Sequence, residues 1–265
     1  MRKNTLVSLT VVFLAFAGVL SAAAVNIPSN LYGHFNQLGS GICEDGSGNN
    51  FACGPVATAN SMMMLDNKYG SSLIGDQDLD FDVDDDVVGL VAAQLAPLMG
   101  CAACNGGTTV AGLIAGKTQY LNANAPGMYY VHSQASPGFQ WFFDELTRGQ
   151  DIEVLVGFYN AQGTRIGGHF ITLNGISGTV NGDTGFLDNG ANIDFIDPSG
   201  GVDRNRGIYE FNDHTLGTTY GVGGNTVTTV VEYGIAESPV PEPGTIVLML
   251  AGVPALLLIR RRATR

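Results

Sequence analysis

Two stretches, VLVGFY at residues 154–159 and HFITL at residues 169–173, decide the predicted fold, because both are short runs of the β-branched and aromatic residues that favour strands. Glycine, asparagine and aspartate residues bound them, as turn-forming residues bound strands. Later stretches of the same texture, residues 192–196, 207–211 and 226–233, are further predicted strands. The second half of the body of the chain is therefore predicted to form an antiparallel sheet.

Four helical stretches are predicted ahead of this sheet. Pro55 suits a first helical turn, where its missing N–H has no partner to lose, and an apolar run at residues 56–65 follows it. Further helices are predicted at residues 87–98, 109–121 and 139–147. Helices followed by strands describe an α+β domain, with an N-terminal helical half packed on a C-terminal antiparallel sheet.

The first 24 residues read as a removable signal peptide. Arg2 and Lys3 form a basic start, residues 6–19 are apolar, and small residues at positions 21–24 suit a signal peptidase. We expect cleavage after Ala24. The alternative is an uncleaved membrane anchor, and the short apolar run favours cleavage over it.

The other end of the chain has a three-part pattern. Residues 240–244 read VPEPG, residues 245–259 are apolar, and residues 260–262 are arginines. These 15 apolar residues are fewer than the roughly 20 that cross a bilayer comfortably, and Pro254 interrupts them. Composition alone indicates a weak span with its arginines at the cytoplasmic face.

This pattern resembles the PEP-CTERM sorting signal, which exosortases process in Gram-negative bacteria that make extracellular polysaccharide. The resemblance covers residues 240–265. It implies an exported protein that passes through the inner membrane and ends at the cell surface or in the extracellular matrix. Its expected partners are a signal peptidase, an exosortase-type sorting enzyme and, transiently through the short helix, the membrane. An ordinary tail anchor is the alternative.

The body of the chain, residues 25–239, has the length of one domain. Its charge is more acidic than the whole-chain value of −12 suggests. Residues 4–259 hold all 24 acidic residues and only six of the 12 basic ones, a net charge of −18. Such a surface repels phosphate backbones, so we expect no nucleic-acid partner. The balance fits an exported protein or one that gathers cations.

Three residues far apart in the sequence could carry nucleophilic chemistry. Cys53 precedes Gly54 and Pro55, at a predicted helix N-terminus, where unpaired N–H groups stabilise a thiolate. His169 begins a predicted strand, and Asp197 ends the next one, where its carboxylate could hold the imidazole. Taken one at a time, the same residues are equally a structural cysteine, a surface histidine and a turn-forming aspartate.

Three segments resemble papain-like cysteine peptidases of the bacteriocin-processing, double-glycine-leader type. ACGPVA at residues 52–57 resembles their nucleophile segment, GHFITLNGI at residues 168–176 their histidine strand, and FIDP at residues 195–198 their aspartate segment. The similarity spans roughly residues 35–235. It implies a papain-like fold in which Cys53 is the nucleophile and His169 the general base and acid.

The resemblance also implies that Asp197 orients the histidine and that a glutamine ahead of the nucleophile helps to form the oxyanion hole. The chain departs from the family here, because the nearest upstream glutamine, Gln37, precedes Cys53 by 16 residues. A glycine-rich insertion at residues 39–50 has to loop out if Gln37 serves. Asn49 and Asn50 are the substitutes.

Four cysteines enter an oxidising compartment if the protein is exported. Cys101 and Cys104 can bridge each other, or one of them can bridge Cys43. A Cys43–Cys53 bridge is the competing pairing, and it would remove the nucleophile. A zinc site is a weaker alternative, because a single Cys-x-x-Cys motif with unevenly spaced partners is a poor match to zinc ligands.

An acidic run at residues 76–86 alternates aspartates with other residues. Oxygen-rich loops of this kind bind calcium. The glycine and glutamate positions of an EF-hand are absent, however, so a solvated acidic loop is the simpler interpretation.

The leading hypothesis is a secreted or surface cysteine hydrolase that acts on peptides or other amides and needs no cofactor or metal. The alternative is a non-catalytic surface or matrix protein that the tail displays.

Overall fold

The structure, a computed structural model, describes residues 21–45, 50–74, 85–101, 107–182 and 184–239. The first 20 residues of the predicted signal peptide and the whole predicted sorting tail lie outside these ranges. Asn49, Cys104 and most of the acidic run also lie outside them. Within the described residues, no helix is both long and apolar enough to cross a membrane.

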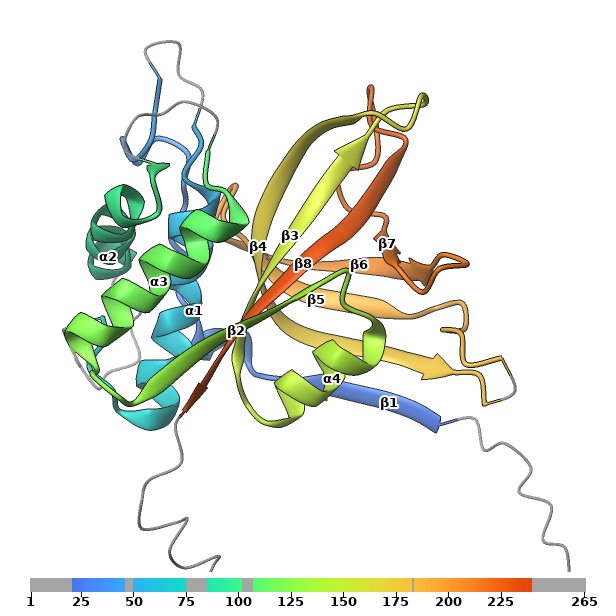
Figure 1. Ribbon diagram of the computed structural model, residues 1–265, viewed down its shortest axis with the longest axis horizontal. Coiled ribbons are helices and arrows are strands. Elements are labelled where there is room, and N and C mark those ends of the chain that lie inside the picture. Colours follow the sequence, from blue (N-terminus) through green and yellow to red (C-terminus); the bar gives the residue numbers. More distant parts are fainter. Residues whose placement is uncertain (1–20, 46–49, 75–84, 102–106, 183, 240–265) are drawn as a thin grey trace, which may run out of the picture.

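One antiparallel sheet of eight strands dominates the described part of the chain (Figure 1). Its strands follow one another in space as β1, β4, β3, β8, β7, β6 and β5, and β2 pairs with the outer part of β8. A further pairing of β4 with β5 closes the order on itself. The strands are β1 (Ser21–Asn26), β2 (Tyr129–Ala135), β3 (Asp151–Tyr159), β4 (Arg165–Val180), β5 (Asn192–Asp197), β6 (Val202–Glu210), β7 (Leu216–Thr218) and β8 (Thr228–Pro239).

The long strand β4 organises the sheet, because it pairs with three neighbours. Along one edge it pairs with β3 and then with β1. Along the other edge it pairs with β5 only from Thr172 onward, where Thr172 faces Ile196. The residues of β4 before Thr172 therefore keep one edge unpaired by β5, and this edge is where the candidate site forms.

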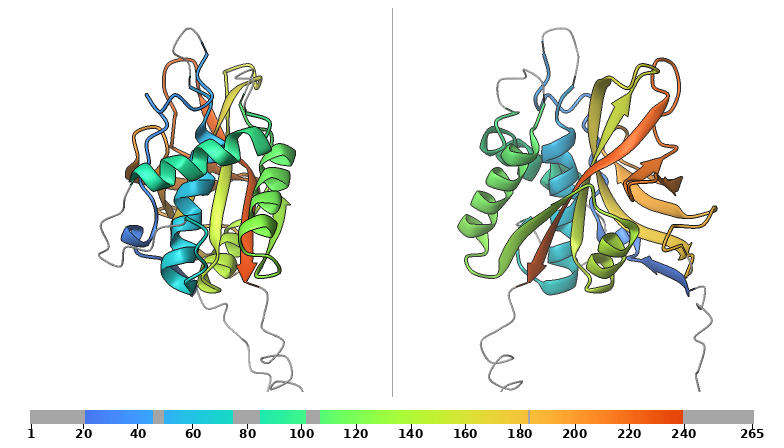
Figure 2. Two further views of the ribbon diagram at one scale, coloured as in Figure 1. Left: turned by 90° about the vertical axis from the view of Figure 1, so that its left-hand side faces the viewer. Right: turned by 45° about the vertical axis from the view of Figure 1, so that its right-hand side comes forward.

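Helices cover both faces of this sheet. The helices α1 (Cys53–Tyr69), α2 (Asp85–Leu98) and α3 (Val110–Asn124) gather on one side (Figures 1 and 2). The helix α4 (Phe139–Thr147) packs beside β1 on the other face. A short 3₁₀ helix, η1 (Ser29–Leu31), precedes them and contacts α1.

The predicted fold class is wrong. An α+β, papain-like fold with an N-terminal helical half packed on a C-terminal sheet requires helices and strands to be separated along the chain. Instead, β1 opens the described chain and β2 stands between α3 and α4, and both belong to the single sheet. The sheet therefore takes strands from the whole length of the described chain, because edge pairing with β4 and β8 recruits N-terminal segments.

The strand β1 includes residues 21–24, which the sequence assigns to the end of the signal peptide. In the described chain, these residues pair in register with β4, from Ser21 facing Val180 to Ala24 facing Ser177. Cleavage after Ala24 would leave Val25 and Asn26 as the remainder of this strand.

The core lies between α1 and the sheet, and α1 is buried over most of its length. Thr172 of β4 donates a hydrogen bond of 2.8 Å to the carbonyl of Ala57, which fixes α1 against the strand. Met62 is fully buried in the same helix, whereas its neighbour Met63 is only partly buried. The residues that position the N-terminus of α1 are thus held by both packing and hydrogen bonding.

Met62→Ala is expected to lower the free energy of unfolding by about 2–5 kcal/mol, because it removes a buried side chain and leaves a cavity. Met63→Ala is the matched control in the same helix, with an expected loss of less than about 1 kcal/mol. Denaturant unfolding followed by circular dichroism measures both. Equal losses for the two variants would show that α1 is not packed as described.

Candidate active site

Cys53 is the first residue of α1, and it is a free thiol of intermediate exposure. Backbone N–H groups of Gly54 and Phe170 donate hydrogen bonds to its sulfur. Phe170 can do so because β5 does not pair with this part of β4. The sulfur thus lies where a helix N-terminus meets an unpaired strand edge, and both supply N–H groups to a negative charge.

His169 lies beside Cys53 and is hydrogen-bonded to it. Its Nε2 lies 2.9 Å from Oδ1 of Asp197, so Nδ1 is the ring nitrogen left for the thiol. Both residues are buried, with side-chain exposures of 11% for His169 and 3% for Asp197. Asp197 ends β5 one residue beyond the last pair of the β4–β5 ladder, and this position brings its carboxylate next to His169.

The charges of these three residues stabilise one another. Burial raises the pKa of the Cys53 thiol, but the hydrogen bond and charge of His169 outweigh this effect, so the pKa lies below its usual value. Burial lowers the pKa of His169, whereas hydrogen bonds to Asp197 and Cys53 raise it, and the result is a pKa of about 9. Each shift favours the charged form of its group, so a thiolate beside an imidazolium is stabilised relative to two isolated side chains.

The Asp197 carboxylate has further partners that keep it ionised. Tyr220 donates a hydrogen bond of 2.8 Å to Oδ2, and the N–H of Ser199 donates one of 2.9 Å to Oδ1. Arg204 lies 3.5 Å from Oδ2. Burial raises the pKa of Asp197, but the hydrogen bonds from His169 and Tyr220 outweigh it and hold the pKa below its usual value.

Tyr220 is a site residue that the sequence did not reveal. Besides its hydrogen bond to Asp197, its ring stacks near that of His169, with centroids 6.0 Å apart. It lies in an irregular segment between β7 and β8, where no motif marks it. Only the three-dimensional fold places it beside the carboxylate.

Gln37 is brought to the same cavity despite its distance in sequence. Its side chain is buried, and its Oε1 has no hydrogen-bond partner among the described residues. Its backbone N–H donates a hydrogen bond of 2.8 Å to the carbonyl of Pro198, the residue after Asp197. The two segments are therefore tied together, and the Gln37 side chain is held in the lining of the cavity.

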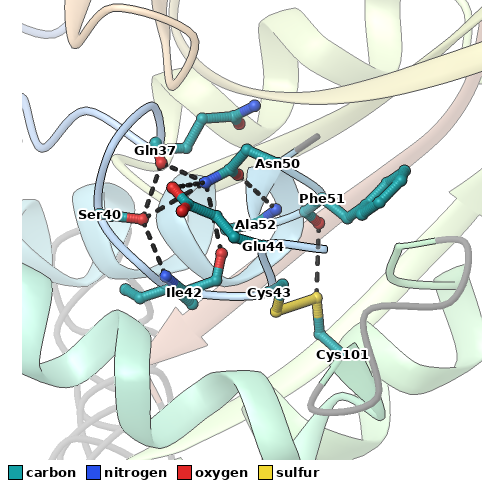
Figure 3. Close-up of a disulfide and its surroundings, with 9 residues drawn as sticks. All are labelled: Gln37, Ser40, Ile42, Cys43, Glu44, Asn50, Phe51, Ala52 and Cys101. Carbon is teal, nitrogen blue, oxygen red and sulfur yellow. Dashed lines mark hydrogen bonds between the residues drawn. A yellow bond between two sulfur atoms is a disulfide. The ribbon is translucent and has the colours of Figure 1, made fainter. Parts of the chain in front are cut away.

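Asn50, an alternative to Gln37 as oxyanion donor, has a structural role instead. Its Nδ2 contacts the carbonyl of Gln37, the carbonyl of Ile42 and a carboxylate oxygen of Glu44, and its Oδ1 accepts from the N–H of Ala52 (Figure 3). This amide holds together the loop that precedes α1. Gln37 is thus the better candidate for an oxyanion donor, and Asn49 lies outside the described residues.

A disulfide joins Cys43 to Cys101 and anchors the same loop to the end of α2 (Figure 3). This is one of the pairings that the sequence left open. The competing Cys43–Cys53 pairing is wrong, because Cys53 is free. The disulfide therefore holds the loop in place and leaves the nucleophile unmodified.

A cavity of about 460 Å³ brings these groups together. Cys53, His169 and Gln37 line it. The start of α3 and its preceding residues, 107–110, line it as well. The Arg165–Glu232 ion pair, with Nε and Oε1 2.8 Å apart, also belongs to the lining. A nucleophile, a base and a glutamine amide in one cavity form the constellation needed for acyl transfer.

No protein-family model and no curated protein matches this chain.

The thiolate of Cys53 is expected to persist at a pH where ordinary thiols are protonated. With iodoacetamide at pH 6, Cys53 should react at least about ten-fold faster than a free cysteine, whose reactivity falls about ten-fold per pH unit below its pKa. Peptide mapping locates the label and separates Cys53 from Cys104. His169→Ala should reduce the alkylation rate of Cys53 to that of a free cysteine. If the alkylation rate of Cys53 in the unmodified protein depends on pH as that of a free cysteine does, the thiolate–imidazolium pair is contradicted.

Tyr220→Phe removes a hydrogen bond to Asp197 but keeps the ring. The pKa of Asp197 should therefore rise. As the pH falls, the carboxylate should be protonated, and the Cys53 thiolate lost, at a higher pH than in the unmodified protein. Hydrogen bonds to charged groups contribute about 1.5–3 kcal/mol, so the acid limb of the alkylation profile should move up by about one pH unit or more. Tyr209→Phe, outside the cavity, is the control and should leave the limb unchanged.

Proposed function

We propose that this protein is a cysteine-dependent hydrolase that cleaves peptide or other amide bonds. One observation carries the proposal. The free thiol of Cys53 is hydrogen-bonded to His169, which is bonded in turn to Asp197, and the thiol and imidazole line one cavity with Gln37. The raised pKa of the imidazole and the lowered pKa of the thiol supply the charge state that a nucleophilic cysteine needs.

The residues have distinct roles in this reaction. The Cys53 thiolate attacks the carbonyl carbon, and the negative charge on the carbonyl oxygen develops where the Gln37 amide and the N–H groups at the start of α1 can reach it. His169, protonated in the resting state, gives its proton to the leaving amine. It then takes a proton from the water that releases the acyl group from Cys53. Asp197 keeps the imidazole oriented throughout.

The cavity lining mixes polar and apolar groups. Phe51, Leu155 and Phe170 line it together with Gln37 and two threonines. The lining also carries one cation and one anion, Arg165 and Glu232, and these two are paired with each other. A peptide backbone, which presents alternating donors and acceptors, suits such a lining better than a large apolar ligand.

Export to the cell surface or the surrounding matrix is part of the proposal. It rests on the basic and apolar start of the chain and on the three-part pattern at residues 240–265. The Cys43–Cys101 disulfide supports it, because disulfides persist in oxidising compartments. A signal peptidase and an exosortase-type enzyme are the proposed processing partners.

Gln37→Ala tests the assignment of the oxyanion donor. With a mixed peptide library and mass-spectrometric detection of products, this variant should lose about 10²–10³-fold in kcat, the usual effect of removing one such donor, and KM should change little. Leu38→Ala, at the exposed neighbouring residue, should keep full activity. Cys53→Ala should cleave nothing.

Cleavage that survives in Cys53→Ala would overturn the proposed nucleophile. If the unmodified protein cleaves no member of the library and Cys53 also alkylates like an ordinary thiol, the protein is a non-catalytic surface protein that the tail displays.

A further inference from the structure

A lysine and three carboxylates are buried together outside the lining of the Cys53 cavity. Lys117 of α3 contacts Asp151 and Glu153 of β3 and Glu237 of β8, and each of the four is 0% exposed. Asp151 and Glu153 are two residues apart and so point to the same face of the sheet. Glu237 is the register partner of Asp151 and joins them on the side that α1 and α3 cover.

The ammonium group of Lys117 touches all three carboxylates. Its Nζ lies 2.6 Å from Oε2 and 2.7 Å from Oε1 of Glu153, and 3.2 Å from Oδ2 of Asp151. It also contacts Oε2 of Glu237. Ser61 of α1 donates a further hydrogen bond to Glu153. The cluster thus spans two helices and two strands.

As an ion cluster this arrangement is poorly balanced. Three carboxylates and one ammonium carry a formal net charge of −2 in a region without solvent access. Burying an uncompensated charge costs several kcal/mol. Burial raises the pKa of Glu153 to about 7, against the opposing effect of Lys117. The neutral form of Glu153 is therefore substantially populated near neutral pH.

Several polar atoms of the cluster also lack directed hydrogen bonds. Both carboxylate oxygens of Glu237 and Oδ1 of Asp151 have no hydrogen-bond partner among the described residues, although Lys117 Nζ contacts Glu237. The hydroxyl of Tyr32 is fully buried, close enough to Asp151 and Glu153 for their charges to raise its pKa, and also unpartnered. Hydrogen bonding alone does not account for the placement of these groups.

The three carboxylates alone have the make-up of a cation site, since one oxygen from each lies within 4.8 Å of the others. The ammonium of Lys117 already contacts all three, however, and so occupies the position that a metal would take. What remains is an amine nucleophile, an adjacent carboxyl electrophile and a second carboxylate that can accept its proton.

We propose that Lys117 and Glu237 condense spontaneously to an amide bond inside the folded protein. This cross-link joins α3 to β8, the last strand before residue 240. Its formation needs no cofactor, partner or oxidant. It is independent of the hydrolase proposal, because none of the four residues lines the Cys53 cavity.

The reaction is balanced within the cluster. The proton that burial favours on Glu153 first passes to Glu237, one of whose carboxylate oxygens lies within 4.8 Å of an oxygen of Glu153. The Glu153 carboxylate then takes a proton from the Lys117 ammonium, and the neutral amine attacks the carboxyl carbon of protonated Glu237. A second proton passes from the nitrogen to the departing hydroxyl group through Glu153. A C–N bond forms, a C–O bond breaks and one water leaves, with no change of oxidation state. Glu153 ends as the neutral acid, and a buried ion pair has been replaced by an amide.

Mass spectrometry of the purified full-length protein tests the proposal. After allowance for processing of the ends and for the disulfide, we expect a mass lower than the sequence value by one water. Trypsin should fail to cut after Lys117. A branched peptide should link residues 69–148 to the peptide that begins at residue 207, because no lysine or arginine separates residue 207 from Glu237.

The digest also distinguishes the carboxylates, since Asp151 and Glu153 fall in a different tryptic peptide, residues 149–165. A branch to that peptide would overturn the assignment to Glu237. An unmodified mass with normal cleavage after Lys117 would overturn the cross-link altogether. Neither result depends on a variant that has to fold.

Two variants sharpen the test. Lys117→Arg keeps the charge but cannot form the amide, so its mass should equal the value calculated from its sequence, with no loss of water. Glu153→Gln keeps the shape but removes the proton acceptor, and after cell-free synthesis the water should be lost at least about ten-fold more slowly than from the newly made unmodified chain. Equal rates in the two proteins would show that Glu153 is not the base.

Discussion

The hydrogen bond of 2.9 Å between His169 and Asp197 is the contact on which the candidate site depends. It exists because β4 continues past the point where its pairing with β5 ends, so that a histidine on one strand faces a carboxylate at the end of the other. The bond occupies Nε2 and turns the other ring nitrogen to Cys53. The residue after Asp197 also anchors Gln37, because the carbonyl of Pro198 accepts a hydrogen bond from the Gln37 N–H. A small change at the end of β5 would therefore displace the base and the oxyanion donor together.

The two buried groups of charges in this protein are built in opposite ways. In the cavity, each charge has an opposite neighbour and several directed hydrogen bonds, as Asp197 has from His169, Tyr220 and Ser199. In the interior, Lys117 faces an excess of carboxylates, some of whose oxygens have no directed partner among the described residues. The first arrangement preserves charges for use in a reaction. The second favours a reaction that removes them.

The residues that the sequence selected lie close together in the structure, whereas the predicted topology was wrong. Cys53 and Asp197 stand at the ends of α1 and β5, and His169 lies inside β4, although the sequence placed it at the start of a strand. Gln37 entered through the resemblance. The predicted helices at residues 87–98 and 139–147 lie within the observed α2 and α4.

The predicted fold class was wrong because two strands of the sheet, β1 and β2, lack a clear strand pattern in the sequence. The residues of β1 read as the small-residue end of a signal peptide, and β2 is a short, mixed segment whose strand character depends on pairing with β8. Tyr220 and Lys117 carry no local signal either. A lysine in a helix is normally solvated, and only the register of β3 and β8 shows what Lys117 meets.

The Cys43–Cys101 bond makes the cavity sensitive to the redox state of its surroundings. Before oxidation, the segment between Gln37 and Cys53 is held to α2 by no covalent link, and a loop of 58 residues is left open. Closing a loop of this length contributes about 4 kcal/mol. In a reducing cytosol the wall that carries Gln37 is therefore less firmly held than it is after oxidation. On the proposed function, a chain that has not left that compartment therefore holds its oxyanion donor less firmly than an exported one does.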